Sequence, residues 1–238
     1  RVTNRHPLMS STIDYRVISI GALGAHPLWN EKGEVRPAHM TTTLVRSDGA
    51  TVLVDPSLPA AALEARLDER AGIRPEDVTH VFLTSFLPVN RRGLERFGEA
   101  TWLISEGERE AIGQLLVEQF RDAETARDDE LAETLRREIA LLRRCEAAPD
   151  RIAEGIDLFP LPGVSPGTCG LLLPTPRATV VVCGDAVPTL EHLEAGRIHA
   201  PCHDVERARE SFTEVIEIAD LIIPGRDNLV MNPLRRPF

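Results

Sequence analysis

Hydrophobic positions along this chain change period several times, which predicts strands that alternate with helices. Short apolar runs typical of strands cover residues 15–20, 40–46, 51–54, 80–83, 100–104, 156–161, 171–173, 179–183 and 221–223. Helical spacing follows Pro59, where Leu63 and Leu67 are one turn apart until Gly72 ends the pattern. A second helix is predicted after Asp204, a residue suited to capping it. Two series of strands, each followed by helices, predict an α/β layered fold.

Between residues 105 and 148 the pattern becomes helical throughout. Ser105 and Glu108 have the spacing of a capping box, which marks a helix start. Two apolar stripes follow, formed by Ile112, Leu115, Leu116, Phe120 and Ala123 and then by Leu131, Leu135, Ile139 and Leu142. They predict a helical hairpin inserted between two strands. The apolar face of such a hairpin needs a surface to pack against. That surface could be the parent domain or a second copy of the chain in a homodimer, and the sequence leaves both alternatives open.

Composition narrows the class of protein. A chain of 238 residues with 42% hydrophobic and 27% charged residues fits a globular protein, which we interpret as one domain over residues 1–238. The net charge of −10 argues against nucleic acid and anionic membranes as partners. No apolar run approaches the ~20 residues that a membrane helix needs, so we expect a cytoplasmic protein.

The four cysteines show neither a C-x-x-C pair nor the dense spacing of a disulfide scaffold. Free buried thiols are therefore expected in a cytosolic protein. A facing pair across a hairpin is the alternative for Cys169 and Cys183, which are equally far from Pro176.

The stretch of residues 79–94 organises the rest of the chain. It begins as a buried strand, breaks at Pro88 and resumes at Gly93. A loop that leaves the end of a buried strand is a common place for catalytic groups, because the strand holds it rigidly. Here Leu87, Pro88 and Val89 can neither bind a metal nor move a proton. The loop occupies a position typical of catalytic groups, but almost none of its side chains can take part in catalysis.

The stretch of residues 79–94 and four further motifs occur in the order and spacing of a known family. Thr84, Pro88 and Gly93 match the frame of its Thr-His-x-His-x-Asp-His signature, and His80 matches a structural histidine. Four other strand ends and turns also match the family, at residues 53–56, which precede this stretch, and at residues 162–167, 182–186 and 223–227, which follow it. The set covers roughly residues 40 to 230 and resembles the metallo-β-lactamase superfamily. This resemblance implies a four-layer αβ/βα sandwich, with the site at one edge of its two sheets.

The same resemblance implies that the metal centre is lost. The family's seven ligand positions are occupied here by Ser85, Leu87, Val89, Asn90, Val164, Asp185 and Arg226. Only the aspartate is a usual ligand, and zinc needs three or four nitrogen, sulfur or oxygen donors. We therefore expect no metal, no zinc cofactor and no metal-activated water at these positions.

Charge suggests what replaces the metal. An isolated buried carboxylate is very costly, so Asp185 needs a partner. Arg226 has a permanent charge and a planar fork that matches a carboxylate. If the family geometry holds, the two side chains pair where the metal would lie. The alternative is that backbone N–H groups hold Asp185 while Arg226 points to solvent.

Two rival chemistries have weaker support. Residues 163–167 match the G-x-S-x-G nucleophile elbow, but Ser165 is followed by a turn and strand, and Pro166 lacks the N–H that the oxyanion hole requires. A relocated metal site would have to use the cluster at residues 202–204, or His26 and His39 from nearby loops. Adjacent residues rarely bind one ion together, and Asp204 already has a predicted role as a helix cap.

These observations lead to two functional hypotheses. The first is a metal-free pseudoenzyme with a binding, regulatory or scaffolding role, in which Arg226, Asn90 and Ser85 contact a small anion. The second is a hydrolase of an ester, lactone or thioester with an atypical site, and only there would zinc be expected. The count of metal ligands favours the first hypothesis, because function belongs to sites and not to folds.

Overall fold

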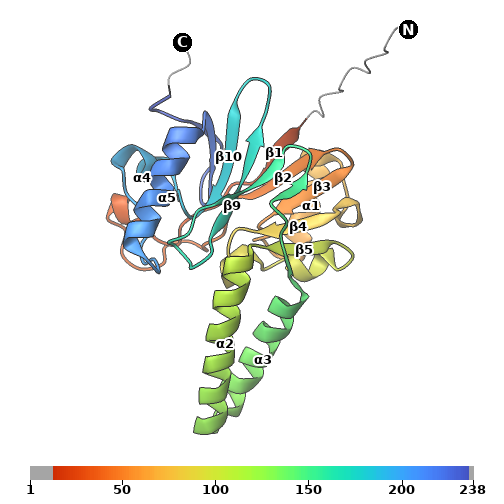
Figure 1. The fold of residues 1–238 in the computed structure, drawn as a ribbon, viewed down its shortest axis with the longest axis vertical. Helices are drawn as coiled ribbons and strands as arrows, with labels where there is room; N and C mark the ends of the chain where they lie inside the picture. The colour runs from red at the N-terminus through yellow and green to blue at the C-terminus, as the bar shows by residue number, and fades with distance from the viewer. Residues whose placement is uncertain (1–12, 236–238) are drawn as a thin grey trace, which may run out of the picture.

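The computed structural model describes residues 13–235, which form two six-stranded sheets packed face to face (Figure 1). The first sheet has, in spatial order, β1 (Asp14–Ser19), β2 (Thr42–Ser47), β3 (Ala50–Val54), β4 (His80–Leu83), β5 (Thr101–Ile104) and β6 (Glu146–Ala147). The second has β12 (Val230–Met231), β11 (Leu221–Pro224), β10 (Thr179–Gly184), β9 (Cys169–Pro174), β8 (Ile156–Pro160) and β7 (Arg151–Ala153). In the first sheet the neighbours β3, β4, β5 and β6 run parallel to one another, and in the second sheet β10 runs parallel to β11.

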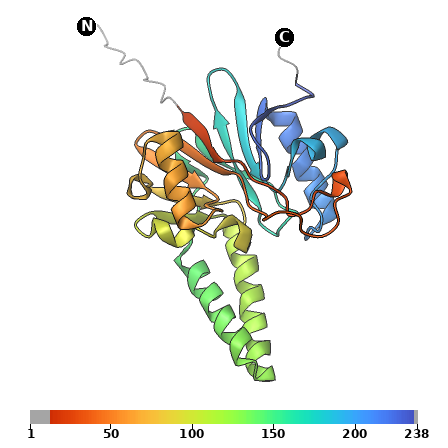
Figure 2. The ribbon, with the colours of Figure 1, turned by 180° about the vertical axis from the view of Figure 1, so that it is seen from behind.

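Helices cover the outer faces of both sheets. Helix α1 (Ala60–Ala71) packs on the first sheet, and α4 (Leu190–Ala195) and α5 (Val205–Ile218) pack on the second (Figures 1 and 2). The layers therefore run helix, sheet, sheet, helix, which confirms the predicted αβ/βα sandwich.

Alternation along each strand explains why the sheets are buried on both faces. In β3, Val52 and Val54 point into the core between the sheets, whereas Leu53 points toward α1. In β10, Val182 faces the other sheet while Val181 faces the outer helices. Both sides of a strand are then apolar, so these strands read as continuous hydrophobic runs.

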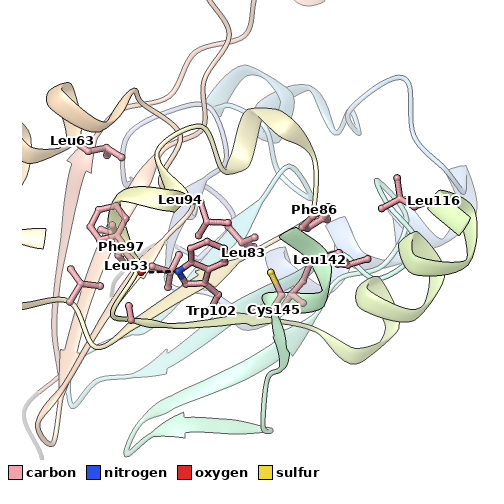
Figure 3. Packing of buried hydrophobic residues seen from close by; sticks show 14 of the residues in the cluster. Leu53, Leu63, Leu83, Phe86, Leu94, Phe97, Trp102, Leu116, Leu142 and Cys145 are labelled. Carbon is pink, nitrogen blue, oxygen red and sulfur yellow. Dashed lines mark hydrogen bonds between the residues drawn. The ribbon is translucent and has the colours of Figure 1, made fainter. Parts of the chain in front are cut away.

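Aromatic side chains fill the outer core of the first sheet, as Figure 3 shows. Phe97 and Trp102 lie side by side there, and the Trp102 indole N–H donates to the Phe97 carbonyl at 2.9 Å. Leu116, Leu142 and Cys145 continue the same cluster into the base of the long helices. The hairpin is thus attached to the parent domain through a packed apolar contact.

Local signals read from the sequence account for several element ends. Asp48 and Gly49, with φ of 46° and 79°, form the tight turn between β2 and β3. Gly72 ends α1 in the left-handed conformation at φ 61°. Asp204 caps α5 by accepting a hydrogen bond from the Arg207 N–H at 3.0 Å. These features confirm the predicted hairpin turn, helix stop and helix cap.

The helical hairpin predicted over residues 105–148 consists of α2 (Glu106–Ala126) and α3 (Asp129–Arg144). It lies between β5 and β6 and extends away from the sandwich in both views (Figures 1 and 2). Ser105 caps α2, since its hydroxyl accepts from the Glu108 N–H at 3.2 Å. The expected capping box is wrong in its second half, because the Glu108 carboxylate binds other groups instead of the cap.

All four cysteines are free thiols, but the expectation that they are buried is wrong for Cys202, which is half-buried. Cys169 faces the core between the sheets while Cys183 faces the outer helices, so they do not meet across the hairpin. Burial raises the pKa of Cys145 to about 11 and that of Cys169 to about 12. In the part of the chain that the structure describes, every helix is too short or too polar to cross a bilayer.

Candidate functional site

Four strand ends meet at one edge of the sandwich and bring together the polar residues of the site. Asp55 follows β3 and Thr84 follows β4 in the first sheet. Asp185 follows β10 and Arg226 lies two residues after β11 in the second sheet. These side chains are buried, although they come from segments far apart in the sequence. The edge is where strand ends and loops of an α/β sheet usually form a ligand site.

Arg226 and Asp185 form the central contact of this edge. The Arg226 Nε donates to Asp185 Oδ1 at 2.8 Å, and its Nη2 donates to Oδ2 at 2.7 Å. The two side chains are only 5% and 4% exposed. The predicted pairing of these residues is confirmed, and its two-bond geometry is the strongest that a guanidinium and a carboxylate can form.

The ion pair sets the charge of both partners. Burial alone would raise the pKa of Asp185, but the charge and hydrogen bonds of Arg226 outweigh it and leave the pKa below its usual value. Burial opposes the charge of Arg226 in turn, yet the carboxylate raises its pKa. Both groups are therefore ionised at neutral pH, and each compensates the other's loss of water.

Two glycines make room for this contact. A Cβ on Gly225 would lie 2.7 Å from Asp185 Oδ1, and a Cβ on Gly184 would lie 2.6 Å from Thr84 Oγ1. Gly184 also has a φ of 53°, which a residue with a side chain rarely adopts. The glycines in the motifs at residues 182–186 and 223–227 thus allow the two sheets' polar groups to approach each other.

Asp55 forms a second buried centre beside the ion pair, and it was recognised in the sequence only as a strand end. Thr84 donates its N–H to Oδ1 at 2.9 Å and its hydroxyl to Oδ2 at 2.7 Å. Asn90 donates to the Thr84 hydroxyl at 3.0 Å. Burial raises the pKa of Asp55 to about 7, and the charge of Asp185 adds to the rise while the Thr84 bonds oppose it.

The backbone of Asp55 is unusual as well. Its φ of 48° places a residue with a side chain in the left-handed region. Such conformations cost about 1 kcal/mol or more and persist only where surrounding contacts fix them. Here the two hydrogen bonds from Thr84 hold the side chain in place.

Of the other predicted positions, Ser85 and Asn90 contribute polar side chains that join the Asp55 network through Thr84. Ser85 is buried and donates to Asn90 Oδ1 at 3.3 Å. Leu87 is 37% exposed and Val89 is half-buried. Val164 is half-buried in the turn before β9, where its carbonyl accepts from the His203 N–H at 3.1 Å.

Glu108 links three segments near this edge, a role that the sequence did not indicate. Its carboxylate is fully buried and accepts from the Phe86 N–H at 2.9 Å, the Ser165 hydroxyl at 2.7 Å and the Gly167 N–H at 2.9 Å. It therefore fixes the loop after β4 to the turn before β9. Ser165 is committed to this network and is followed by Cys169 at the start of β9, which agrees with the rejection of a nucleophile elbow.

Two histidines, His26 and His192, lie next to the site and both contact Thr189. Thr189 Oγ1 lies 2.9 Å from His192 Nδ1 and 3.2 Å from His26 Nε2, and the same His26 nitrogen lies 3.3 Å from Glu191 Oε2. Burial lowers the pKa of His192 to about 4, and the charge of His26 adds to this shift. His192 is thus neutral at physiological pH. Trp29 stacks on His26 with ring centroids 4.1 Å apart.

A cavity of about 310 Å³ lies against His26 of this pair. Its lining includes His26, Trp29, Arg36, Thr189, Glu191 and Arg226. Arg36 pairs with Glu31, and Arg226 with Asp185, so both guanidinium groups already have a carboxylate partner. The side chain of Trp29 is the large aromatic group that the cavity presents, and the residue is 54% exposed.

The residues at this edge do not fit a zinc ion. Both oxygens of Asp185 are occupied by a guanidinium, which repels a cation. Asp55 binds Thr84 through both of its oxygens. Over residues 13–235, no three His, Cys, Asp or Glu side chains are grouped so that they could hold a metal ion. A structural zinc site needs four such donors and a catalytic one needs three.

Comparisons with known proteins give the fold. No family model matches the sequence, and a search of curated proteins finds no match. Among solved structures, a candidate metallo-β-lactamase from Thermotoga maritima is 16% identical with a TM-score of 0.65, over 92% of this chain and 99% of its own. A probable metal-dependent hydrolase from Staphylococcus aureus is 14% identical with a TM-score of 0.65, over 95% and 94% of the two chains.

AidC, a dizinc quorum-quenching lactonase, is 14% identical with a TM-score of 0.61, over 87% of this chain and 86% of its own. The chain therefore has the metallo-β-lactamase fold, as its motifs indicated. At these identities the similarity establishes architecture, and the chemistry has to be argued from the residues of the site.

Proposed function

We propose that this protein is a metal-independent binding protein with the metallo-β-lactamase fold, which takes a small molecule in the cavity beside Arg226. The observation that carries the proposal is the buried, two-bond ion pair between Arg226 and Asp185. Arg226 is a permanent cation bound to Asp185, the one remaining acidic ligand, and supplies the charge compensation that a metal would otherwise supply. Hydrolysis by a metal-bound water is then unavailable at this edge.

The cavity supports binding of a small organic ligand. Its volume of about 310 Å³ is at the lower end of the range of ligand sites, ~300–1,000 Å³. Trp29 offers an indole to stack against, and Thr189 and Glu191 offer hydrogen-bond groups. Such a lining suits a planar, polar molecule. The small anion expected from the sequence would instead have to compete with Asp185 and Glu31 for the two arginines.

Tryptophan fluorescence provides the test. The chain has two tryptophans, of which Trp102 is buried and Trp29 lines the cavity, so changes in emission upon titration report on Trp29. Titration with uracil, a planar polar probe that does not emit in the tryptophan band, is expected to quench or shift this emission in the presence of a chelator. Because Trp29→Leu also removes the reporter, its binding is followed by calorimetry, which should show weaker binding than the parent chain. Saturable binding that requires added zinc would contradict the proposal.

A second candidate is a hydrolase with an atypical site. Two observations favour it: similar structures include a quorum-quenching lactonase, and Asp55 has a pKa of about 7, which suits a general base. However, Asp55 is only 1% exposed, and both of its oxygens bind Thr84. It is also absent from the cavity lining given above.

Hydrolysis assays separate the two candidates. An N-acyl homoserine lactone, a p-nitrophenyl ester and a thioester would be offered with chelator and, separately, with added zinc. The binding proposal predicts rates equal to those of buffer in both conditions. Turnover that disappears in Asp55→Asn but persists in Arg226→Lys would establish the hydrolase instead.

A further inference from the structure

The cavity beside Arg226 has two guanidinium groups in its lining, and both are already paired. Arg36 Nη1 donates to Glu31 Oε2 at 2.8 Å. Arg226 donates to both oxygens of Asp185, at 2.8 and 2.7 Å. A carboxylate at such a distance cancels most of the field of the guanidinium that it binds. These two arginines therefore present little net positive charge to a molecule in the cavity.

Two acidic side chains in the same lining have no such partner. Over residues 13–235, neither Glu191 nor Asp227 forms an ion pair with a lysine or an arginine. Asp227 accepts from the backbone N–H groups of Leu190 at 3.1 Å and Asn228 at 2.7 Å. The Glu191 side chain is 35% exposed, and its Oε2 lies 3.3 Å from His26 Nε2. The lining and its paired carboxylates thus hold four carboxylates against two guanidinium groups.

Hydrogen bonds keep Glu191 in its ionised form. Partial burial tends to raise the pKa of its carboxyl group, but hydrogen bonds with Thr189 and with its own backbone outweigh burial and leave the pKa below its usual value. An ionised carboxylate only accepts hydrogen bonds, so the proton of a neutral His26 ring is on Nε2, which contacts Glu191. His26 Nδ1 is then an acceptor, and it is buried without a hydrogen-bond partner among residues 13–235. A ligand with N–H groups would supply a donor to this lining.

Trp29 gives the cavity an aromatic wall. One face of the indole stacks on His26 with ring centroids 4.1 Å apart, and the residue is still 54% exposed. Arg36 lies loosely over the ring, since its Cζ is 5.8 Å from the centroid, near the outer limit of ~6 Å for a cation–π contact. The exposed part of the indole is free to contact a ligand. The face of an aromatic ring attracts positive charge and repels negative charge.

From the excess of carboxylates and the aromatic wall we infer that the ligand of this cavity is a flat organic cation with N–H donors, such as an amidinium or a protonated heteroaromatic amine. The inference rests on the proposed function, because it assigns the charge of the molecule that the cavity binds. The cation stacks on Trp29 and donates to the carboxylate of Glu191. The net charge of −10 on the whole chain also favours the approach of a cation over that of an anion.

Three probes of the same shape test the charge of the ligand. Benzamidine is a cation, benzamide is neutral and benzoate is an anion, and calorimetric titration measures the affinity of the protein for each. Measurement at pH 8, above the ordinary histidine pKa of ~6.5, keeps histidine charge out of the comparison. Benzamidine should bind about tenfold more tightly than benzamide at ~0.05 M salt, and benzoate should bind most weakly. The preference should shrink at ~0.5 M salt, because the charges are partly exposed.

Glu191→Gln removes one negative charge and keeps the shape of the side chain. It should reduce the preference for benzamidine over benzamide about tenfold, and it should change benzamide binding by less than about threefold. Glu194→Gln is the matched control, since Glu194 is exposed on the same helix α4 and is not in the lining. It should leave the preference unchanged. Circular dichroism verifies that both variants are folded.

The outcomes separate this inference from the proposed function. Equal binding of benzamidine and benzamide, or tighter binding of benzoate, would overturn the inference while binding in the cavity stands. A preference for benzamidine that persists in Glu191→Gln would overturn it as well, because the charge would then be read elsewhere. If neither these probes nor uracil bound saturably, the proposed function would be wrong and the inference with it.

Discussion

Two buried carboxylates at the same edge of the sandwich have opposite pKa shifts. Asp55 and Asp185 each follow a strand and are almost inaccessible to solvent. Burial raises the pKa of Asp55 to about 7, whereas that of Asp185 lies below its usual value despite the same burial. The difference lies in the partners. Asp55 receives hydrogen bonds from an uncharged threonine, and Asp185 receives two from a guanidinium.

This comparison shows what determines the state of a buried acid. Loss of water favours the neutral form of both residues, and neutral hydrogen bonds offset only part of it. The full positive charge of Arg226, at hydrogen-bond distance from Asp185, outweighs the loss of water and makes the ionised form the more stable one. At neutral pH the protein thus holds one ionised carboxyl group and one that is about half-protonated, and only the ionised one depends on a cation.

The largest expected effect comes from removing that cation. Arg226→Met would leave Asp185 buried without a partner and should lower the free energy of unfolding by about 3–5 kcal/mol at neutral pH. The pKa of Asp185 should then rise, as that of Asp55 does. Urea unfolding monitored by circular dichroism measures the loss.

The matched control removes both charges. Arg226→Met combined with Asp185→Leu should recover most of the stability, because no unpaired charge is left in the core. A single variant as stable as the parent would show that the pair is not the compensating contact described above.

The pH dependence of stability should come from the other carboxyl group. The folded pKa of Asp55, about 7, is above the unfolded value near 3.8, so the folded state holds the proton more tightly. Its contribution is therefore largest below pH ~4 and declines as the pH rises to ~7, by roughly 2–4 kcal/mol. Asp185 behaves in the opposite way, since its contribution is present above the unfolded pKa near 3.8 and is lost as the pH falls from there through its depressed folded pKa.

Asp55→Asn removes this titration. Unfolding of the variant between pH 4 and 8 should lack the decline that the parent chain shows over that range. If both proteins had the same slope, Asp55 would not be the titrating group.

Glu108 extends the comparison to a third buried carboxylate, which binds only neutral donors. Glu108→Ala leaves two backbone N–H groups and the Ser165 hydroxyl without their acceptor. We expect a loss of about 2–3 kcal/mol in chemical denaturation. The neighbouring exposed residue gives the control, as Glu106→Ala should change stability by less than about 0.5 kcal/mol.

The smallest expected loss of stability comes from removing a single neutral hydrogen-bond donor to Asp55. Thr84→Val removes the hydroxyl that donates to Asp55 and accepts from Asn90. It should cost about 1 kcal/mol and raise the pKa of Asp55 further, because one bond that favours the ionised form is lost. Carboxyl chemical shifts followed by NMR would detect the change. A lowered pKa would contradict this view of the network.

Much of the fold could be predicted from the sequence, because strand ends and turns have local causes. Gly184 and Gly225 stand where a Cβ would collide with Thr84 and Asp185, so the motifs that contain them indicate how the strand ends approach each other. Asp204 was predicted as a helix cap because a cap depends on the residues immediately after it. The pair of Arg226 and Asp185 followed from charge once the fold placed them together.

The remaining parts of the site depend on contacts between distant segments. Glu108 has the spacing of a capping box, but its carboxylate meets residues on two other loops that the sequence does not place near it. The raised pKa of Asp55 depends on complete burial, which a position at the end of a strand does not reveal. The contact between His26 and Thr189 joins residues 163 positions apart.

The central claim is that the Arg226–Asp185 pair replaces a metal ion. Its most direct test is elemental analysis of the purified protein for transition metals, without added zinc or chelator. The account predicts less than about a tenth of an equivalent, since the buried pair leaves no set of donors for an ion. Close to one equivalent or more would contradict it, and would mean that the metal is held by residues outside the ion pair.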